Sequence, residues 1–395
     1  MQNSPLIFVT KLSIAKNGLV RATRRSLTTT NVGFYRPELD VLRFFAFLLV
    51  FLFHGLDVSN GIFGSLRIAG ALGVCLFFLL SSYLITELLE REKNQSGAIH
   101  LRAFYIRRGL RIWPLYFTVL IFDYLLQRHL NPGFFTGGRL LAFFLLAGNW
   151  YVAQHGLTAT LSTPLWSIPI EEQFYILWPS ARKYLHRSGS VLFSVVMFAI
   201  AYLAIAYLCR AGSRDSNAIW VNSFVQFQFF STGALLALAL RGRSPKLHPL
   251  VRVILFLAGL AILGAAQHIF QVKEGAAFGG LHRVAPGYFC ANLACTLFFF
   301  SVLGETRLGK LKPLVYLGKI SFGLYVFHWA MLRISIRALP HLLRHRQIAR
   351  TTANALEVAL AFALTVLLAS LSYRFFESPI LRYKKRFEFI RTRSI

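Results

Sequence analysis

The sequence is short of charged residues, and above all of acidic ones. Only 15% of its 395 residues are charged, whereas about a quarter is usual for a soluble chain. Hydrophobic residues make up 56%, and Phe alone occurs 38 times along the chain. This composition excludes an ordinary soluble domain. It predicts an all-α polytopic membrane protein whose helices are apolar around their whole perimeter.

The shortage of acids leaves 43 Lys and Arg against 15 Asp and Glu, a net charge of +28. The basic residues cluster in short gaps between apolar runs, which is typical of cytoplasmic loops next to anionic lipid. Some of this charge could also bind an anionic cofactor. The sequence has no nucleic-acid-binding motif, so we expect the lipid bilayer, and no nucleic acid, as a partner.

Cysteine is also scarce. The four cysteines are Cys75, Cys209, Cys290 and Cys295, all in apolar runs or at their ends. They do not have the spacing of metal ligands. We therefore expect small buried hydrophobic residues, with neither disulfides nor a metal site.

The chain shows no internal repeat and no second soluble domain. Residues 1–34 are basic, rich in Ser and Thr, and lack the apolar core of a signal peptide. We interpret them as a flexible cytoplasmic tail, with a weak amphipathic membrane contact as the alternative. One membrane domain is predicted over residues 35–385, and a short basic cytoplasmic tail over residues 386–395.

Eleven apolar runs are candidates for membrane crossing. They lie near residues 41–56, 66–87, 112–127, 140–153, 165–179, 191–209, 219–240, 250–268, 286–304, 314–334 and 355–373. If 140–153 is re-entrant or interfacial, the basic loops 181–187, 241–246 and 305–312 all face the cytoplasm. The sequence thus predicts ten spans with both termini inside. The basic segment 337–350 would lie outside, and a contact with an anionic acceptor is one explanation.

The first apolar run carries two ionisable residues on one helix face. Arg43 and His54 are eleven residues apart, which is close to three full turns and roughly 16 Å along the axis. A lone His in an apolar segment is more often a packing residue. Two ionisable groups on one face of one span instead indicate a functional site. The ordinary pKa of imidazole suits a general base near neutral pH.

Arginines gather at the start of the third run, in "FYIRRGLRIWPLYF". Arg108 and Arg111 are three residues apart and point to a common region, and Arg107 adds a third charge. Arginine forks suit phosphate groups. The alternative is ordinary anchoring of a helix end at the cytoplasmic surface.

Two adjacent carboxylates, Glu171 and Glu172, lie in the otherwise apolar "LWSIPIEEQFYILWP". Neighbouring helical residues face about 100° apart, so the two cannot share one role. One is expected to face the interior of the bundle, and the other to pair with an arginine. A helix-packing ion pair is the alternative. His328, deep in "LGKISFGLYVFHWAML", is a further ionisable group within a span.

Taken in order, these stretches resemble the acyltransferase 3 family of integral membrane acyltransferases. The resemblance rests on "YRPELDVLRFFAFLLVFLFHG", "FYIRRGLRIWPLYF", "WSIPIEEQFYILWP", "ISFGLYVFHWAML" and "YRFFESPILRY", and covers residues 35–385. The second helix departs from the family pattern, because Cys75 replaces an Asp and Ser82 a Gly. Any role of that acid must be absent or supplied elsewhere.

The resemblance implies transfer of an acyl group, usually acetyl, from cytoplasmic acetyl-CoA or another acyl-CoA to a hydroxyl of a carbohydrate. A cell-surface or exported polysaccharide is the expected acceptor, and the bacterial inner membrane the expected location. His54 would act as base, and Arg43 would position the donor or steady charge on the thioester oxygen. Arg108, Arg111 and Arg107 would bind the CoA phosphates. Glu171 and Glu172 complete the catalytic candidates.

A membrane transporter of an anionic or lipid-linked glycan is the alternative function. Buried His54, His328, Glu171 and Glu172 could then form a proton relay. The clustered arginines and the absence of an inverted repeat favour the enzyme. The sequence predicts neither the acceptor, nor the acyl group, nor the oligomeric state.

Overall fold

The computed structural model describes residues 34–390, apart from 58–63, 65–66, 131–132, 134, 212–215, 273–279 and 343–349. Regular structure within these ranges is helical throughout, without a strand. The prediction of an all-α protein is therefore confirmed for the described part of the chain. Nearly all of the predicted N-terminal tail, residues 1–33, and the end of the predicted C-terminal tail, residues 391–395, lie outside the described residues.

Ten long helices correspond to ten of the apolar runs. They are α2 (Pro37–Gly55), α4 (Gly73–Ser96), α5 (Leu101–Leu130), α8 (Ser167–Tyr184), α9 (Arg187–Arg210), α11 (Ser223–Leu240), α12 (Pro249–His268), α13 (Leu281–Val302), α15 (Ser321–Leu342) and α16 (Arg350–Ser372).

Shorter elements connect or extend these helices. They are η1 (Gly70–Leu72), α6 (Gly137–Phe144), α7 (Gly148–His155), η2 (Thr163–Trp166), α10 (Ser216–Trp220), η3 (Leu308–Lys310), α14 (Lys312–Lys319), the π-helical segment η4 (Tyr373–Glu377), α17 (Ser378–Lys384) and η5 (Lys385–Phe387).

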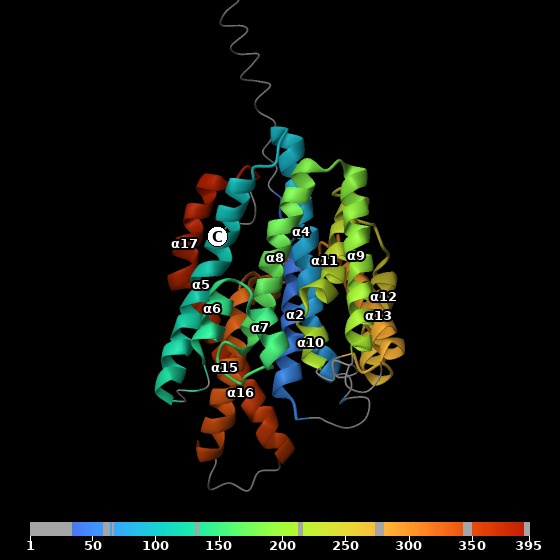
Figure 1. Cartoon of the computed structure of the whole chain (residues 1–395). Helices are drawn as coiled ribbons and strands as arrows, with labels where there is room; N and C mark the ends of the chain where they lie inside the picture. Colours follow the sequence, from blue (N-terminus) through green and yellow to red (C-terminus); the bar gives the residue numbers. More distant parts are fainter. Residues whose placement is uncertain are drawn as a thin grey trace, which may run out of the picture.

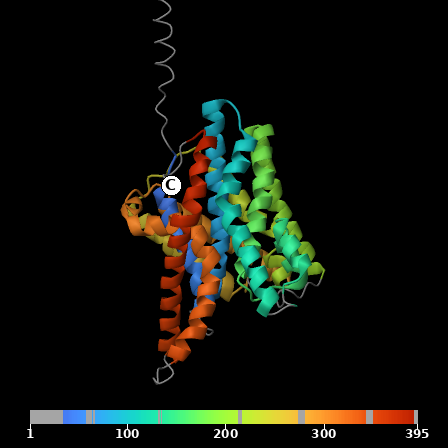
Figure 2. The same cartoon turned by 90° about the vertical axis from the view of Figure 1, so that its left-hand side faces the viewer.

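The long helices lie side by side and run up and down through the molecule (Figures 1 and 2). Helices α2 and α4 are central, and α4 packs against α11 as well as α2. The pair α15 and α16 projects beyond the other helices at one end (Figure 1). Helix α17, near the C-terminus, lies beside α5. The chain thus brings its last described residues against its third long helix.

Seven of the described helical stretches are long and apolar enough to cross a membrane. They are Arg67–Ser96, Leu101–Leu130, Arg187–Arg210, Asn217–Leu240, Pro249–His268, Leu281–Val302 and Thr352–Phe387. The other three long helices are α2, α8 and α15; α2 and α8 carry several ionisable side chains within 18 or 19 residues. The multi-pass character is confirmed, whereas the count of ten spans stays a prediction.

The run at residues 140–153 does not form one helix. Helices α6 and α7 have eight residues each and are separated at Leu145–Ala147, where Leu146 has a positive φ of 57°. Each is about 12 Å long, far less than the roughly 30 Å thickness of the hydrocarbon core. This agrees with the prediction of a segment that does not cross the membrane.

Glycines fix the position of the central helices. A side chain at Gly318 of α14 would overlap the backbone carbonyl of Asp40 on α2, and one at Gly233 of α11 would overlap that of Leu79 on α4. Close backbone approach at small residues is the usual way that helices associate in membranes. Helices α2 and α4, which carry much of the site described next, are therefore held from both sides.

Candidate active site

A cavity lined by charged side chains, here called the basic cavity, lies where α2 and α5 begin. Four of the sequence-predicted arginines and one of the glutamates line it. Its charged lining consists of the cations Arg36, Arg43, Arg107, Arg108, Arg111 and Lys384 and the acids Asp40, Glu92, Glu171 and Glu388. The cations outnumber the acids by six to four, so the cavity suits an anionic ligand.

The arginines of α5 differ in their contacts. Arg107 donates to the Glu92 carboxylate at 2.9 Å and to the backbone carbonyl of Phe387, so it ties α5 to α4 and to the C-terminal residues. Arg108 instead lies over the rings of Phe104 and Tyr175, with its guanidinium carbon 5.6 and 5.5 Å from the two ring centroids. Arg108 forms no ion pair within the described ranges, which leaves its guanidinium available to a phosphate.

The two adjacent glutamates face different surroundings. Glu171 lines the basic cavity, and its carboxylate accepts a hydrogen bond from the Tyr175 hydroxyl at 2.7 Å and a longer one from Ser81 at 3.5 Å. Glu172 is buried and accepts from the indole N–H of Trp113 at 3.1 Å. The expectation that one carboxylate faces the interior agrees with the position of Glu171. The partner of Glu172 is the indole of Trp113. Among the described residues, neither Glu171 nor Glu172 forms an ion pair with an arginine.

We predict that Glu171→Gln lowers turnover more than Glu172→Gln. The variant Glu171→Gln loses a negative charge that faces the arginines. We expect its turnover to fall by about ten- to a hundredfold, which corresponds to a charge-assisted hydrogen bond of about 1.5–3 kcal/mol. In the Glu172 variant the amide oxygen can still accept from Trp113, and the loss should be smaller. Acyl transfer by purified, correctly folded variants measures the difference. Losses that are equal and trivial would make both carboxylates packing groups.

His54 lies at the other end of α2, in a second cavity, here called the His54 cavity. Most of its lining is aromatic or apolar, with rings from Phe53, Trp166, Trp220, Tyr325 and Trp329, and Thr158 and Thr163 add two hydroxyl-bearing side chains. The His54 ring centroid is 4.9 Å from that of Trp329 and 5.4 Å from that of His328. Apart from His54, the described lining contains no Asp, Glu, Lys, Arg or His. The structure therefore separates His54 from the arginine cluster.

A third cavity lies between these two and shares lining residues with both. This middle cavity has Arg43, Ile112, Glu171 and Phe322 in common with the basic cavity, and Val74 and Tyr325 in common with the His54 cavity. The lining follows helical periodicity: Val74, Ser81 and Leu88 on α4 lie seven residues apart, and Phe322, Tyr325 and Trp329 on α15 share a face. The three cavities thus follow one another along the helices from the arginines to His54, with shared lining residues at each junction, and this succession is here called the path.

Arg43 is positioned midway along this path. It lines both the basic and the middle cavity, donates to the Ser321 hydroxyl at 3.3 Å, and lies over the ring of Phe77 at 5.6 Å. The shared face of Arg43 and His54 agrees with the helical spacing. Their separation of roughly 16 Å along the axis keeps them from touching the same small group.

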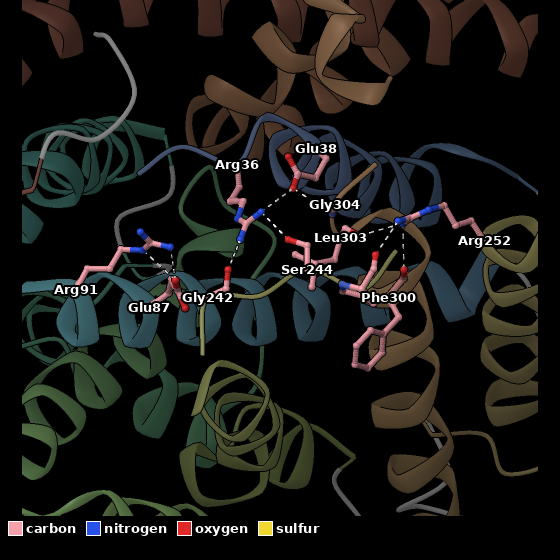
Figure 3. A network of polar contacts seen from close by, with 11 residues as sticks. Arg36, Glu38, Glu87, Arg91, Gly242, Ser244, Arg252, Phe300, Leu303 and Gly304 are labelled. Carbon is pink, nitrogen blue, oxygen red and sulfur yellow. Dashed lines mark hydrogen bonds and ion pairs between the residues drawn. The ribbon is translucent and has the colours of Figure 1, made fainter. Parts of the chain in front are cut away.

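A polar network holds the start of α2 in place (Figure 3). Arg36 donates to the Ser244 hydroxyl at 2.6 Å and to the Gly242 carbonyl at 2.9 Å. Glu38 accepts from the backbone N–H of Gly304 at 3.2 Å, and Arg252 donates to backbone carbonyls that include Leu303 (Figure 3). The loops after α11 and α13 therefore meet at the N-terminal end of α2. This agrees with the prediction that these two basic loops lie on one side of the membrane.

Sequence reasoning missed the C-terminal wall of the basic cavity. Lys384, Glu388 and Ile390 line it, and the ring of Phe389 stacks on His100 with a centroid distance of 4.0 Å. The basic composition of residues 386–395 predicts only a short cytoplasmic tail and gives no sign of this contact. Helical spacing could have indicated Tyr175 as a lining residue, because it lies four residues after Glu171 and so shares its helix face.

One departure from the family pattern, the cysteine at position 75, lies apart from the three cavities. Cys75, where the resembled family has an acid, is fully buried with its sulfur 3.7 Å from the Gln226 side-chain oxygen. It does not line any of the three cavities. Among the residues the structure describes, no group of three or more His, Cys, Asp or Glu side chains could hold a metal ion.

Comparison with known proteins shows the family of the chain. The family model of the acyltransferase 3 family, described as an acyltransferase domain, matches residues 36–374. The chain belongs to this family. The match begins at the Arg36 network, includes all three cavities except the C-terminal wall and the residues just before Arg36, and ends within the π-helical segment. The resemblance inferred from the motifs is thereby confirmed.

Members of the family among curated proteins give a closer comparison. Peptidoglycan O-acetyltransferase OatA of Listeria monocytogenes is 28% identical over 371 residues, which are 88% of this chain and 56% of that protein. O-acetyltransferase OatA of Staphylococcus aureus is 26% identical over 389 residues, which are 91% of this chain and 60% of that protein. The chain thus spans somewhat more than half the length of these relatives. No solved structure matches it.

Proposed function

We propose that this acyltransferase 3 protein is a membrane O-acetyltransferase. It takes an acetyl group from acetyl-CoA bound in the basic cavity and transfers it to a hydroxyl of a glycan near His54. Cell-wall polysaccharide is the acceptor class that the names of the relatives suggest. The observation that carries the proposal is the succession of three neighbouring cavities, from the arginine-lined basic cavity to the cavity of His54 at the other end of α2.

The donor side of the proposal follows from charge. CoA carries several phosphates, and Arg108 and Arg111 line the cavity that would receive them. Arg107 contributes to the same cavity mainly by holding Glu92 in place. The acyl group of CoA sits at the end of a long flexible arm, and the middle cavity would hold this arm. Arg43 is then a guide for the arm, because it is too far from His54 to contact the carbonyl that reacts there.

The chemistry at His54 is an ordinary acyl transfer. The imidazole removes the proton from the acceptor hydroxyl as its oxygen attacks the thioester carbon. A carbon–oxygen bond forms, the carbon–sulfur bond breaks, and the proton passes from the imidazolium to the departing CoA sulfur. The aromatic lining of the His54 cavity offers flat apolar faces to a sugar ring.

We infer that the basic end of the bundle faces the cytoplasm, in the inner membrane of a bacterium. The basic loops after α11 and α13 meet at this end, which supports a cytoplasmic position by the positive-inside rule. Acyl-CoA is made in the cytoplasm, whereas exported glycans lie on the other side. The path through the bundle would then let donor and acceptor meet without crossing the membrane. Family membership favours this reading over a glycan transporter.

Labelled acetyl-CoA tests the function directly. Membranes that contain the protein should move label from the acetyl group into the glycan fraction, and membranes without it should not. In the variant Arg108→Ala/Arg111→Ala, two charge-assisted contacts to phosphate are lost. The acetyl-CoA concentration for half-maximal transfer should therefore rise by at least about tenfold. Absence of label in every sample would overturn acetyl transfer and favour the transporter.

A matched variant separates phosphate binding from anchoring at the membrane surface. Arg102→Ala/Lys183→Ala also removes two positive charges at this end of the bundle, from exposed positions outside the basic cavity. We expect its dependence on acetyl-CoA to match that of the wild type. If both double variants behave alike, Arg108 and Arg111 anchor the helix and do not bind the donor.

A further inference from the structure

His328 is a buried titratable group that the proposed reaction has not used. It lies on α15, one residue before Trp329, and its side chain is fully buried. Its ring centroid is 6.1 Å from that of Phe47 and 5.6 Å from that of Tyr325. Such an apolar surround disfavours the charged imidazolium, so His328 is held as the neutral ring.

One hydrogen bond fixes which nitrogen of His328 carries the hydrogen. The Nδ1 atom lies 2.6 Å from the backbone carbonyl oxygen of Tyr325. A carbonyl oxygen only accepts, so Nδ1 must be the donor. In a neutral imidazole the other nitrogen, Nε2, then carries the lone pair and can only accept a hydrogen bond.

This acceptor is buried and has no hydrogen-bond partner within the described ranges. A buried polar atom left unpaired costs about 1–3 kcal/mol, so such an atom calls for an explanation. The ring of His54 lies beside the ring of His328, with centroids 5.4 Å apart and planes tilted by 38°. At that separation, nitrogens on facing ring edges can reach hydrogen-bond distance.

We propose that His328 is a positioning residue for His54, and that its Nε2 atom accepts a hydrogen bond from the His54 imidazolium that forms during acyl transfer. The pair works in one direction, because Nδ1 of His328 is engaged by Tyr325 and cannot take part. His328 thus orients the base and stabilises its protonated form. The role of His54 as base rests on the proposed function, whereas the pairing of the two rings does not.

The other titratable and charged groups near His54 do not provide this contact. Arg67 donates to the carbonyl oxygens of Phe53 and Leu56 at the end of α2. The hydroxyl of Tyr325 is bound to Ser167 and to the Pro164 carbonyl. From α16, Asn354 and Val358 reach Gly55, and neither titrates.

Asp57 follows α2, and its backbone N–H contacts Asn354 at 3.0 Å. On α15, the guanidinium carbon of Arg333 lies 5.8 Å from the ring centroid of Trp329, and both Asp57 and Arg333 are kept in every variant. A change at His328 therefore alters one neighbour of His54 while the surrounding charges stay the same.

The test measures the protonation of His54 without any acceptor or donor. Diethyl pyrocarbonate modifies an imidazole ring when it is neutral and not when it is protonated. Labelling at His54 is read by mass spectrometry of the full-length protein, and its pH dependence gives the titration midpoint of His54. In His328→Phe we expect this midpoint to move to lower pH by about one unit, because the protonated ring has lost an acceptor. His328→Gln, which places an amide oxygen near the position of Nε2, should keep a midpoint close to that of the wild type.

Activity gives the second readout. The acid limb of the pH–rate profile should move in the same direction in His328→Phe, with acyl transfer at least tenfold lower. Phe51→Leu is the control for loss of packing, since Phe51 is a buried neighbour of Phe47 and does not titrate. It should leave the midpoint unchanged.

The outcomes separate the two proposals. An unmoved midpoint in His328→Phe overturns the pairing, whatever happens to activity. A shifted midpoint in a protein that transfers no acyl group upholds the pairing and overturns the function. A midpoint that moves equally in the Phe51 variant assigns the shift to packing and overturns the pairing.

Discussion

His54→Ala is expected to abolish acetyl transfer while the protein remains folded in the membrane. In the proposed reaction His54 is the base that activates the acceptor, and positioned general bases contribute about 10²–10⁴-fold to rate. The described lining of its cavity offers no carboxylate, no lysine and no second histidine to take over. Incorporation of label from acetyl-CoA into the glycan fraction, compared with wild-type membranes at equal protein level, measures the loss.

The control for this prediction is another histidine in the same chain. His186 is exposed at the start of α9, outside the three cavities. His186→Ala should transfer acetyl groups like the wild type. Equal label in His54→Ala and wild type would return His54 to the status of a packing residue, and acceptor activation would then require another group.

Val74→Trp is expected to stop transfer without stopping donor binding. Val74 is 6% exposed and lines both the middle and the His54 cavity, so an indole there fills the junction between them. The basic cavity does not include this residue. We expect transfer to fall at least about a hundredfold, as misplacement of a reacting group near the chemistry does. Binding of acetyl-CoA, measured by titration calorimetry on the purified protein, should change by no more than a few-fold.

Overpacking a helix junction can cost about 1–3 kcal/mol in stability, so folding has to be checked separately. Val195→Trp places the same side chain on an exposed position of α9 and should behave like the wild type. The variant Val74→Leu adds a smaller volume at the same position, so its rate of transfer should lie between those of the wild type and Val74→Trp. Normal transfer by well-folded Val74→Trp would contradict the path as the route of the acyl group.

Helical periodicity went far in predicting this molecule. The composition indicates a helical membrane protein, and the spacing of Arg43 and His54 places both on one side of α2, where both line the path. The clustering of Arg107, Arg108 and Arg111 predicts a basic site, and all three line one cavity. The geometric part of these predictions agrees with the structure, because each depends on residues within one helix.

Contacts between distant segments were beyond this reasoning. Periodicity separates Glu171 from Glu172 by an angle, but only the packing of α8 against α4 and α5 decides which one meets Ser81 and which one meets Trp113. Likewise, Arg107 forms an ion pair and Arg108 does not, because Glu92, near the end of another helix, reaches only Arg107. Tertiary packing thus selects among alternatives that the sequence leaves open.

The basic cavity has a wall from each end of the described chain. Phe34, Tyr35 and Arg36 contribute from the beginning, and Lys384, Glu388 and Ile390 from the end. During synthesis at the ribosome, this cavity therefore cannot form completely until the last described helix has been made. Partly made chains that already carry His54 and the arginines of α5 would hold acyl-CoA poorly.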